Sequence, residues 1–266
     1  MPEYGYRWCG EAGRAILLGD PTGDDRMSEK PMFAGASVLL TGVGREGQVG
    51  EIVAEAFARE GARLILVDRT REQVESRAAA LQSKGHDAVA LPCDLTDESQ
   101  VAALAAAVDK RVSGRLHALV HMAGGFVMSG PVADSDAGVW GRQLAINLTT
   151  AFLATRALLP MLRTGRGAIV YFGSEAALPG SRVAAMAAYA VAKGGVVTLM
   201  RAVAQEERGN GVRANAVAPS SIRTTTNVQA MGDGVRYVER EEVADAVLYL
   251  CSEHASSISG QVLRLG

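Results

Sequence analysis

The sequence is poor in the residues that build metal sites, disulfide frameworks and nucleic-acid surfaces. Its 266 residues include three cysteines, Cys9, Cys93 and Cys251, which are far apart and odd in number. This pattern fits neither a disulfide framework nor a zinc site, so we expect no metal and a reducing, cytoplasmic compartment. Neither sign of charge dominates, with 27 Lys and Arg against 29 Asp and Glu, and aromatic residues make up only 5%. Nucleic acid is therefore not an expected partner.

Long apolar runs are also missing. The longest apolar stretch, near residues 183–204, is interrupted by Lys193 and Arg201, whereas a bilayer-spanning helix needs about 20 apolar residues. We therefore expect no membrane partner. Residues 1–30 contain scattered glycines and one short apolar run. They are predicted to form an N-terminal extension with little regular structure, in which Met27 is a candidate for the natural start.

From residue 37 onward, short apolar runs rich in β-branched residues alternate with longer segments of helical spacing, which is typical of βαβ units. Strands are predicted at residues 37–41, 63–68, 88–92, 118–122, 168–172, 213–218 and 261–265. Helices are predicted from about 49 to the glycine at 61 and at about 70–84, 97–112, 139–163, 187–208 and 240–251. Continuous apolar strands indicate that helices cover both faces of the sheet. Residues 31–266 should thus form one α/β domain, a doubly wound Rossmann-type sheet of seven parallel strands that binds ligands at the strands' carboxyl ends.

A glycine-rich loop follows the first predicted strand and leads directly into a helix. Its sequence, residues 41–50, is Thr-Gly-Val-Gly-Arg-Glu-Gly-Gln-Val-Gly. Glycines there let the backbone approach a pyrophosphate, and the helix N-terminus offers free N–H groups. The candidate cofactor-binding residues in this loop are Gly42, Gly44, Gly47, Gln48 and Val49. The alternative is a tight strand-to-helix turn that binds no ligand.

The ends of the next three strands carry further candidates for a dinucleotide site. Asp68 ends the second strand about 20 residues past the glycines, where a carboxylate can bind the ribose hydroxyls of the adenosine half. This favours NAD, although Arg69 follows and could contact the 2′-phosphate of NADP, so the choice between the two stays open. The third and fourth strands end at Asp94 and Leu95, near the expected adenine, and at the small residues Ala123 and Gly124.

Ser174 ends the fifth strand, and Tyr189 and Lys193 follow four residues apart on a predicted helix. Positions i and i+4 share one face of a helix, so the phenol and the ammonium point to the same place. A neighbouring cation favours the phenolate and should lower the tyrosine pKa toward the range in which it exchanges protons with an alcohol or carbonyl oxygen. The serine hydroxyl can donate to that oxygen. The alternative is an ordinary surface pair on an alanine-rich helix.

In this combination and order, the motifs of residues 36–266 resemble the short-chain dehydrogenase/reductase family, including its 3-ketoacyl reductase-like members. The resemblance implies that Tyr189 is the general acid/base, that Ser174 orients the substrate, and that Lys193 binds the nicotinamide ribose and lowers the tyrosine pKa. It also implies that Asn147 holds a proton-relay water. The segment after the sixth strand is similar to the family's nicotinamide-contacting segment, which adds Pro219, Ile222 and Thr224 to the expected cofactor site.

The chain departs from the family pattern at several positions. The glycine loop is two residues longer, which leaves Gln48 at the family's middle glycine and Gly50 at the third. Read as Gly-x-Gly-x-x-Gly, Gly42, Gly44 and Gly47 fit instead, so the glycine that faces the pyrophosphate is undecided. His121 replaces an asparagine that ties strands together in the family, and we expect it to be structural.

These residues favour an NAD(P)-dependent enzyme that transfers a hydride between the nicotinamide and a ketone or secondary alcohol. Apolar residues beside the site, among them Phe126, Met128 and Val183, favour a small neutral substrate. Small residues on the helices around Asn147 and Tyr189, together with the family resemblance, imply a homo-oligomer, either a tetramer or a dimer. One alternative is a non-catalytic dinucleotide-binding sensor or scaffold. Another, reduction of a carbon–carbon double bond, is disfavoured because such relatives space their Tyr and Lys further apart.

Overall fold

The computed structural model describes residues 31–266, so the predicted extension at 1–30 and the candidate start Met27 lie outside the described residues. Seven parallel strands form one sheet in the order β3-β2-β1-β4-β5-β6-β7. The strands are β1 (Ser37–Thr41), β2 (Arg63–Val67), β3 (Ala88–Ala90), β4 (Ala118–His121), β5 (Ala168–Phe172), β6 (Arg213–Pro219) and β7 (Val262–Leu265). The predicted doubly wound, seven-stranded fold is confirmed.

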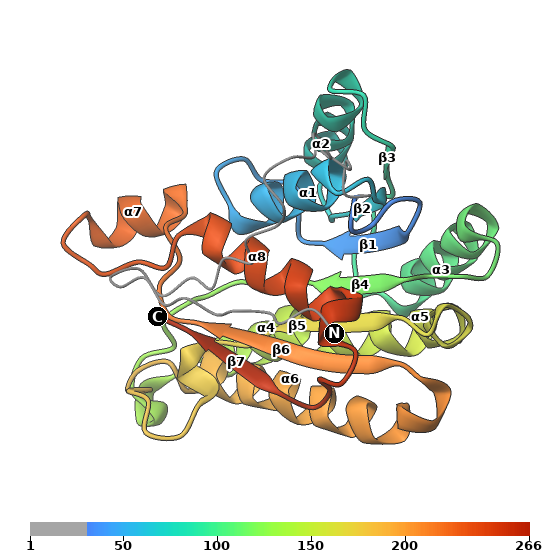
Figure 1. Ribbon diagram of the computed structural model, residues 1–266. Coiled ribbons are helices and arrows are strands. Elements are labelled where there is room, and N and C mark those ends of the chain that lie inside the picture. The colour runs from blue at the N-terminus through green and yellow to red at the C-terminus, as the bar shows by residue number, and fades with distance from the viewer. Residues whose placement is uncertain (1–30) are drawn as a thin grey trace, which may run out of the picture. The chain divides into compact units, whose positions relative to one another are not determined.

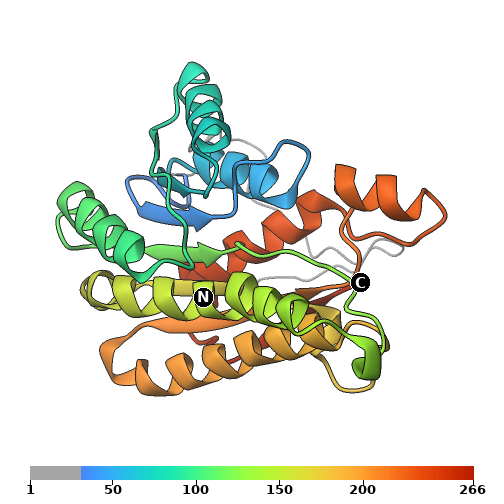
Figure 2. The same cartoon turned by 180° about the vertical axis from the view of Figure 1, so that it is seen from behind.

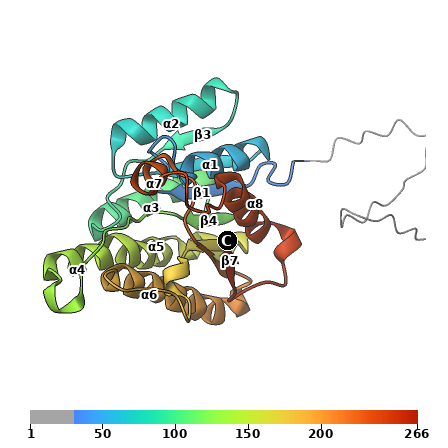
Figure 3. The same ribbon diagram turned by 90° about the vertical axis from the view of Figure 1, so that its left-hand side faces the viewer.

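Helices cover both faces of the sheet, as Figures 1 and 3 show. Neighbouring side chains of a strand point to opposite faces, so Val38 and Leu40 pack in one core cluster while Leu39 packs in the other. The first cluster lies under α1 (Val49–Arg59), α2 (Arg71–Ser83) and α8 (Arg240–Cys251). The second lies under α3 (Glu98–Val112), α5 (Thr150–Gly165) and α6 (Ala187–Glu206). The central strands therefore carry apolar residues on both faces of the sheet.

The helix predicted at 139–163 differs from the structure in one respect that concerns the site. It begins as α4 (Ala137–Leu144), passes through a π-helical turn at Ala145–Thr149, and continues as α5. The helix α4 packs beside α6, and Figure 2 shows this face of the sheet. A π-turn accommodates one extra residue and occurs often at functional sites. Apolar periodicity does not reveal it, because the apolar face continues on both sides.

The segment that follows β6 contains a helix that the sequence patterns did not predict. It is α7 (Thr225–Met231), which lies at the carboxyl end of the sheet apart from the layers. The Thr224 hydroxyl accepts a hydrogen bond from the Asn227 N–H (3.2 Å) and so caps the helix start. This short polar helix buries no complete apolar face, which is why periodicity missed it.

Two helical stretches, Ala137–Gly165 and Ala187–Glu206, are long and apolar enough on average to cross a membrane. Both pack on the sheet: Leu158 and Leu162 of the first and Val196 and Met200 of the second belong to the same buried cluster. Core helices commonly reach such a composition, and this packing accounts for the apolar residues of both stretches. That the protein has no membrane partner stays a prediction.

Candidate active site

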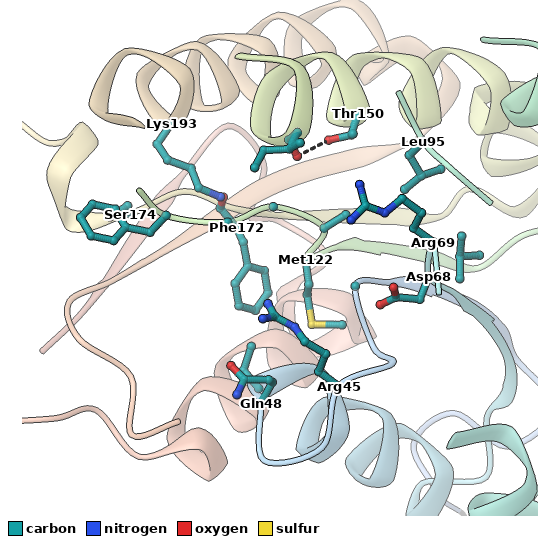
Figure 4. A pocket seen from close by; sticks show the side chains of 18 of the residues that line it. Arg45, Gln48, Asp68, Arg69, Leu95, Met122, Thr150, Phe172, Ser174 and Lys193 are labelled. Atoms are coloured by element: carbon teal, nitrogen blue, oxygen red, sulfur yellow. Dashed lines mark hydrogen bonds between the residues drawn. The ribbon is translucent and has the colours of Figure 1, made fainter. Parts of the chain in front are cut away.

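A cavity of about 550 Å³ lies at the carboxyl ends of the strands. The strand order reverses between β1 and β4: β2 and β3 follow β1 on one side, and β5, β6 and β7 follow β4 on the other. Open α/β sheets bind ligands at such a point. Figure 4 shows Asp68 and Arg69 toward one end of the cavity and Ser174 and Lys193 toward the other. The predicted residues that line it are Gly42, Gln48, Val49, Asp68, Arg69, Asp94, Leu95, Ala123, Gly124, Ser174, Tyr189, Lys193, Pro219 and Ile222.

The structure assigns separate roles to the glycines of the loop. At Gly42 (φ +72°) a Cβ would lie 2.8 Å from the Ala123 backbone nitrogen, so the loop passes β4 closely. At Gly50 a Cβ would lie 2.4 Å from the Gly42 carbonyl oxygen, so this glycine brings α1 against the loop. Gly50 therefore has the helix-packing role, and Gly42 is the glycine that lines the cavity. Gly44 and Gly47 are outside the cavity wall.

The adenosine end of the cavity is organised around Asp68. One of its carboxylate oxygens accepts the Gly44 N–H (2.9 Å) and the other accepts the Thr70 N–H (3.3 Å). These bonds fix the carboxylate beside the glycine loop while each oxygen retains a further lone pair. The guanidinium-bearing residues Arg45 and Arg69 also line this end. The end thus presents one carboxylate and two arginines.

These residues fit a dinucleotide. Gly42 and Gly124 form a cradle of bare backbone in the cavity wall, and a side chain on Gly124 is excluded because a Cβ there would lie 2.5 Å from the Asn147 amide oxygen. The cavity extends from Asp94 and Leu95, past this cradle, to Tyr189. Among residues 31–266, no group of three His, Cys, Asp or Glu side chains could hold a metal ion.

Tyr189 stands in the first turn of α6, next to Ser174 at the end of β5. Burial raises the pKa of Tyr189 above its ordinary value, and the Ser174 hydroxyl acts in the opposite direction. The sequence predicts a lowered pKa through Lys193. The structure gives the opposite direction, because desolvation of the phenol is the largest influence on its pKa. The Lys193 ammonium lies 5.8 Å from the centre of the ring. The phenol is therefore protonated at neutral pH.

Lys193 is buried, and its ammonium donates to the Phe172 carbonyl oxygen (2.8 Å) at the end of β5. This bond fixes the long side chain toward the cavity. Burial lowers the pKa of Lys193 to about 8. A buried lysine with a single backbone partner carries a charge that water does not screen.

Asn147 lies in the π-turn and is also buried. Its side-chain amide donates to the Gly125 carbonyl oxygen (3.0 Å) and accepts from the Gly125 N–H (3.2 Å). The side chain thereby holds the loop after β4 and does not itself line the cavity. The predicted water relay through Asn147 stays a prediction, and the structure adds a positioning role to it.

His121 connects the strands to the helix that carries Asn147. Its ring nitrogens lie 3.3 Å from the Thr41 hydroxyl and 3.2 Å from the Thr150 hydroxyl. Thr150 in turn donates to the Ile146 carbonyl oxygen (2.9 Å) inside the π-turn, the bond drawn in Figure 4. Burial, with the Lys193 charge, lowers the pKa of His121 to about 3. His121 is thus a neutral structural residue, in accord with its expected role.

Thr224 was predicted to contact the nicotinamide, but it is outside the cavity wall and its hydroxyl caps α7. Several wall residues were not predicted as ligand-binding, namely Arg45, Thr70, Gln73, Cys93, Thr96, Met122, Gly125, Ile146, Thr150, Phe172, Gly173, Ser220 and Asn227. Most adjoin predicted residues, and strand-end position was the signal that could have found them. Asn227 could not be found this way, because it belongs to the unpredicted α7.

An apolar rim borders the end of the cavity that holds Tyr189. The ring of Phe126 meets the ring of Tyr189 edge-on, with 5.0 Å between their centres, and Phe126, Val127 and Met128 are each about half exposed. The carbonyl oxygen of Ala185 accepts from the Ser129 N–H (2.8 Å) and the Gly130 N–H (3.1 Å), which ties this loop to the segment before α6. Ala185 has a φ of +62°, which is unfavourable for a residue with a side chain. The strained residue thus fixes the rim close to Tyr189.

The family model described as enoyl-(acyl carrier protein) reductase matches residues 42–265 of the chain. The chain belongs to the short-chain dehydrogenase/reductase family. It is 36% identical over 242 residues to 2-(S)-hydroxypropyl-CoM dehydrogenase 3 of Xanthobacter autotrophicus, which covers 84% of this chain and 92% of that protein. Meso-2,3-butanediol dehydrogenase of Serratia marcescens is 35% identical over 238 residues, covering 86% of this chain and 92% of that protein.

Solved structures give the same result. The crystal structure of gox2181 matches with a TM-score of 0.82 at 29% identity, over 90% of this chain and 96% of that one. A short chain dehydrogenase from Mycobacterium smegmatis matches with a TM-score of 0.77 at 31% identity, over 89% and 93%. The chain is thus an oxidoreductase of a family that acts on CH–OH groups with nicotinamide cofactors.

Proposed function

We propose that this protein interconverts a small neutral secondary alcohol and its ketone with NAD(H), and that Tyr189 is the general acid/base. The observation that carries the proposal is the position of Tyr189 and Lys193, one turn apart on α6 and beside Ser174, at one end of a cavity whose other end presents Asp68.

In the proposed reaction, a bound nicotinamide would supply or accept the hydride at the carbinol carbon. Tyr189 donates its phenolic proton to the carbonyl oxygen during reduction and takes it back from the alcohol during oxidation. Ser174 donates a hydrogen bond to the same oxygen as negative charge develops. Lys193 stabilises that charge with its buried ammonium, which donates to the Phe172 carbonyl oxygen at the end of β5. Asn147 holds the Gly125 backbone that forms the neighbouring wall.

Asp68 supports the preference for NAD over NADP. Its carboxylate is fixed by the Gly44 and Thr70 N–H groups at the position of a ribose reader, and a 2′-phosphate there would meet like charge. Arg45 and Arg69 line the same end and oppose this preference. The Asp68 carboxylate determines the cofactor preference because backbone hydrogen bonds hold it in place, whereas both arginines are exposed.

The rim at Phe126, Val127 and Met128 supports an uncharged substrate with an apolar substituent. The relatives named above are a 2-(S)-hydroxypropyl-CoM dehydrogenase and a meso-2,3-butanediol dehydrogenase, and both names describe secondary alcohols. Reduction of a carbon–carbon double bond, the reaction in the name of the family model, is disfavoured because Tyr189 and Lys193 stand four residues apart.

A second candidate function is dinucleotide binding without turnover. It is favoured by a relative from Xanthobacter autotrophicus, 38% identical over 229 residues, that is described as an inactive 2-(S)-hydroxypropyl-CoM dehydrogenase 2. Against it, Asn147, Ser174, Tyr189 and Lys193 are all present. The last three line one end of the cavity, and Asn147 binds the Gly125 backbone of its wall.

We also propose a cytoplasmic homo-oligomer, a tetramer or a dimer. Large apolar side chains stay exposed on three consecutive helices of one layer, Trp140 on α4, Phe152 on α5 and Val191 on α6. Gly195, one of the small residues of α6, instead serves internal packing, because a Cβ there would lie 2.7 Å from Leu148. Light scattering coupled to size-exclusion chromatography should give two or four times the mass of the chain, and a monomer would contradict the proposal.

The deciding experiment has two parts. Calorimetric titration with NADH and with NADPH should give tighter binding of NADH. Absorbance at the NADH band should then report turnover of racemic 2-butanol and meso-2,3-butanediol, or of the matching ketones. Cofactor binding with no hydride transfer to any simple carbonyl would favour the sensor or scaffold, and binding of neither cofactor would contradict both functions.

A further inference from the structure

Gln48 occupies an unusual place in the glycine loop. It is the N-cap residue of α1, with extended backbone (φ −101°, ψ 168°), but its side chain makes no capping hydrogen bond to that helix. The side-chain amide instead donates to the hydroxyl of Thr226 on α7 (3.0 Å), a residue 178 positions further along the chain. A glycine at this position, as in loops of the usual family length, has no side chain to make this contact.

The start of α7 also rests directly on the backbone of the glycine loop. The Thr225 N–H donates to the Gly47 carbonyl oxygen (3.1 Å). Gly47 has a φ of +70°, and a Cβ there would lie 2.0 Å from the Thr225 hydroxyl oxygen, so only glycine allows this approach. Gly47 therefore serves the contact with α7, which explains why it is absent from the cavity wall.

The other end of α7 is held by a different part of the chain. The Tyr237 hydroxyl donates to the Gly232 carbonyl oxygen (2.6 Å) and lies 3.3 Å from that of Asn227. Asn227 lines the cavity, so a shift of α7 moves part of the cavity wall. Within residues 31–266, Gln48 to Thr226 is the one side chain to side chain hydrogen bond between the glycine loop and α7.

We propose that Gln48 is a positioning residue that couples cofactor binding to the placement of α7 over the active site. This inference rests on the proposed dinucleotide site. Gln48 lines the cavity in the loop that would hold the pyrophosphate, and the same side chain holds α7. Ordering of the loop by a dinucleotide therefore orders α7 as well, and with it Asn227.

The coupling is tested by hydrogen–deuterium exchange of residues 225–231 with and without saturating NADH, after calorimetry has established NADH binding. In the parent protein NADH should slow this exchange. In Gln48→Ala and in Thr226→Val the slowing should fall by about two- to tenfold, the range expected for one neutral hydrogen bond. The double variant should show no further loss, because both changes remove the same contact.

Two control variants distinguish loss of the coupling between NADH and α7 from a general increase in the flexibility of α7. Thr226→Ser keeps the hydroxyl and should retain the NADH effect. Gln229→Ala places the same substitution as Gln48→Ala on an exposed residue of α7 and should also retain it. Equal NADH protection of α7 in the parent and in Gln48→Ala would overturn the inference, as would bound NADH with no protection of α7 in the parent. Failure of NADH and NADPH to bind would instead overturn the proposed function on which the inference rests.

Discussion

The two ends of the cavity differ in how far their side chains are exposed to water. At the end that holds Asp68, both Asp68 and Asp94 are half-buried and Arg69 is exposed. At the catalytic end, Lys193 and Asn147 are buried, and burial shifts the pKa of both Tyr189 and Lys193 toward the neutral form. Charges in water discriminate between ligands, whereas desolvated groups change how readily they hold a proton. In the proposed function, cofactor recognition and proton transfer therefore take place at different ends of one cavity.

The largest effect is expected from removal of the Tyr189 phenol. Tyr189→Phe should lower kcat by about 10²- to 10⁴-fold, the usual contribution of a general acid/base, while the dissociation constant for NADH stays nearly unchanged. Tyr171→Phe is the matched control, because that buried hydroxyl pairs with Thr155 (2.8 Å) outside the cavity. It should keep its turnover. If Tyr189→Phe retained the parental kcat, its acid/base role would be wrong.

The pH dependence should differ between the two directions of the reaction. Because burial raises the pKa of Tyr189, the phenol is protonated at neutral pH. Alcohol oxidation needs the deprotonated form, so its kcat/KM should rise with pH by up to about tenfold per unit on the alkaline side of neutrality. Ketone reduction should not rise over the same range. Measurements in both directions from pH 6 to about 10 check this, and an oxidation rate independent of pH would contradict it.

Changes at the exposed end should alter binding and leave the chemistry intact. Asp68→Asn keeps an oxygen for the Gly44 N–H but loses the charge, so NADH affinity should fall by about tenfold while NADPH affinity rises. Arg69→Ala should lower the affinity for NADPH and leave the affinity for NADH unchanged. Calorimetry with each cofactor measures the ratio of the NADH affinity to the NADPH affinity. If the ratio of the two affinities is the same in all three proteins, neither side chain reads the ribose.

The smallest effect on turnover is expected at His121. Its pKa is about 3 in the folded protein and 6.5 ordinarily, so the unfolded chain binds a proton between these values and the folded protein does not. Stability should be fully present above pH 6.5 and decrease below it, by up to about 1.4 kcal/mol per pH unit. His121→Asn should flatten this slope in urea unfolding at pH 5 and 7. An unchanged slope would mean that His121 is not the group responsible.

Sequence reasoning located the parts of the site that follow from chain geometry. Asp68, Asp94 and Gly124 were found because the carboxyl ends of parallel strands meet at one edge of a sheet. Tyr189 and Lys193 were found because i and i+4 share a helix face. These inferences need only local spacing and the strand order.

The remaining parts depend on contacts that spacing does not encode. The Gln48–Thr226 bond joins residues that are 178 positions apart, and the direction of the Tyr189 pKa depends on how deeply the fold buries the phenol. The ambiguity between Gly47 and Gly50 was resolved only by seeing what a side chain would meet at each position. Local patterns thus predicted which residues meet, and tertiary packing decided what each one does.

The π-turn at Ala145–Thr149 holds one residue more than a regular helical turn. One residue of an α-helix corresponds to a rotation of about 100° and a rise of about 1.5 Å. A wider π-turn takes up one such residue within itself, so deleting a single residue here would restore a regular helix and leave α4 and α5 nearly in place. The change would fall on the turn, where Asn147 binds the Gly125 backbone and Ile146 accepts from Thr150. The extra residue therefore matters for the wall of the cavity and not for the packing of the two helices.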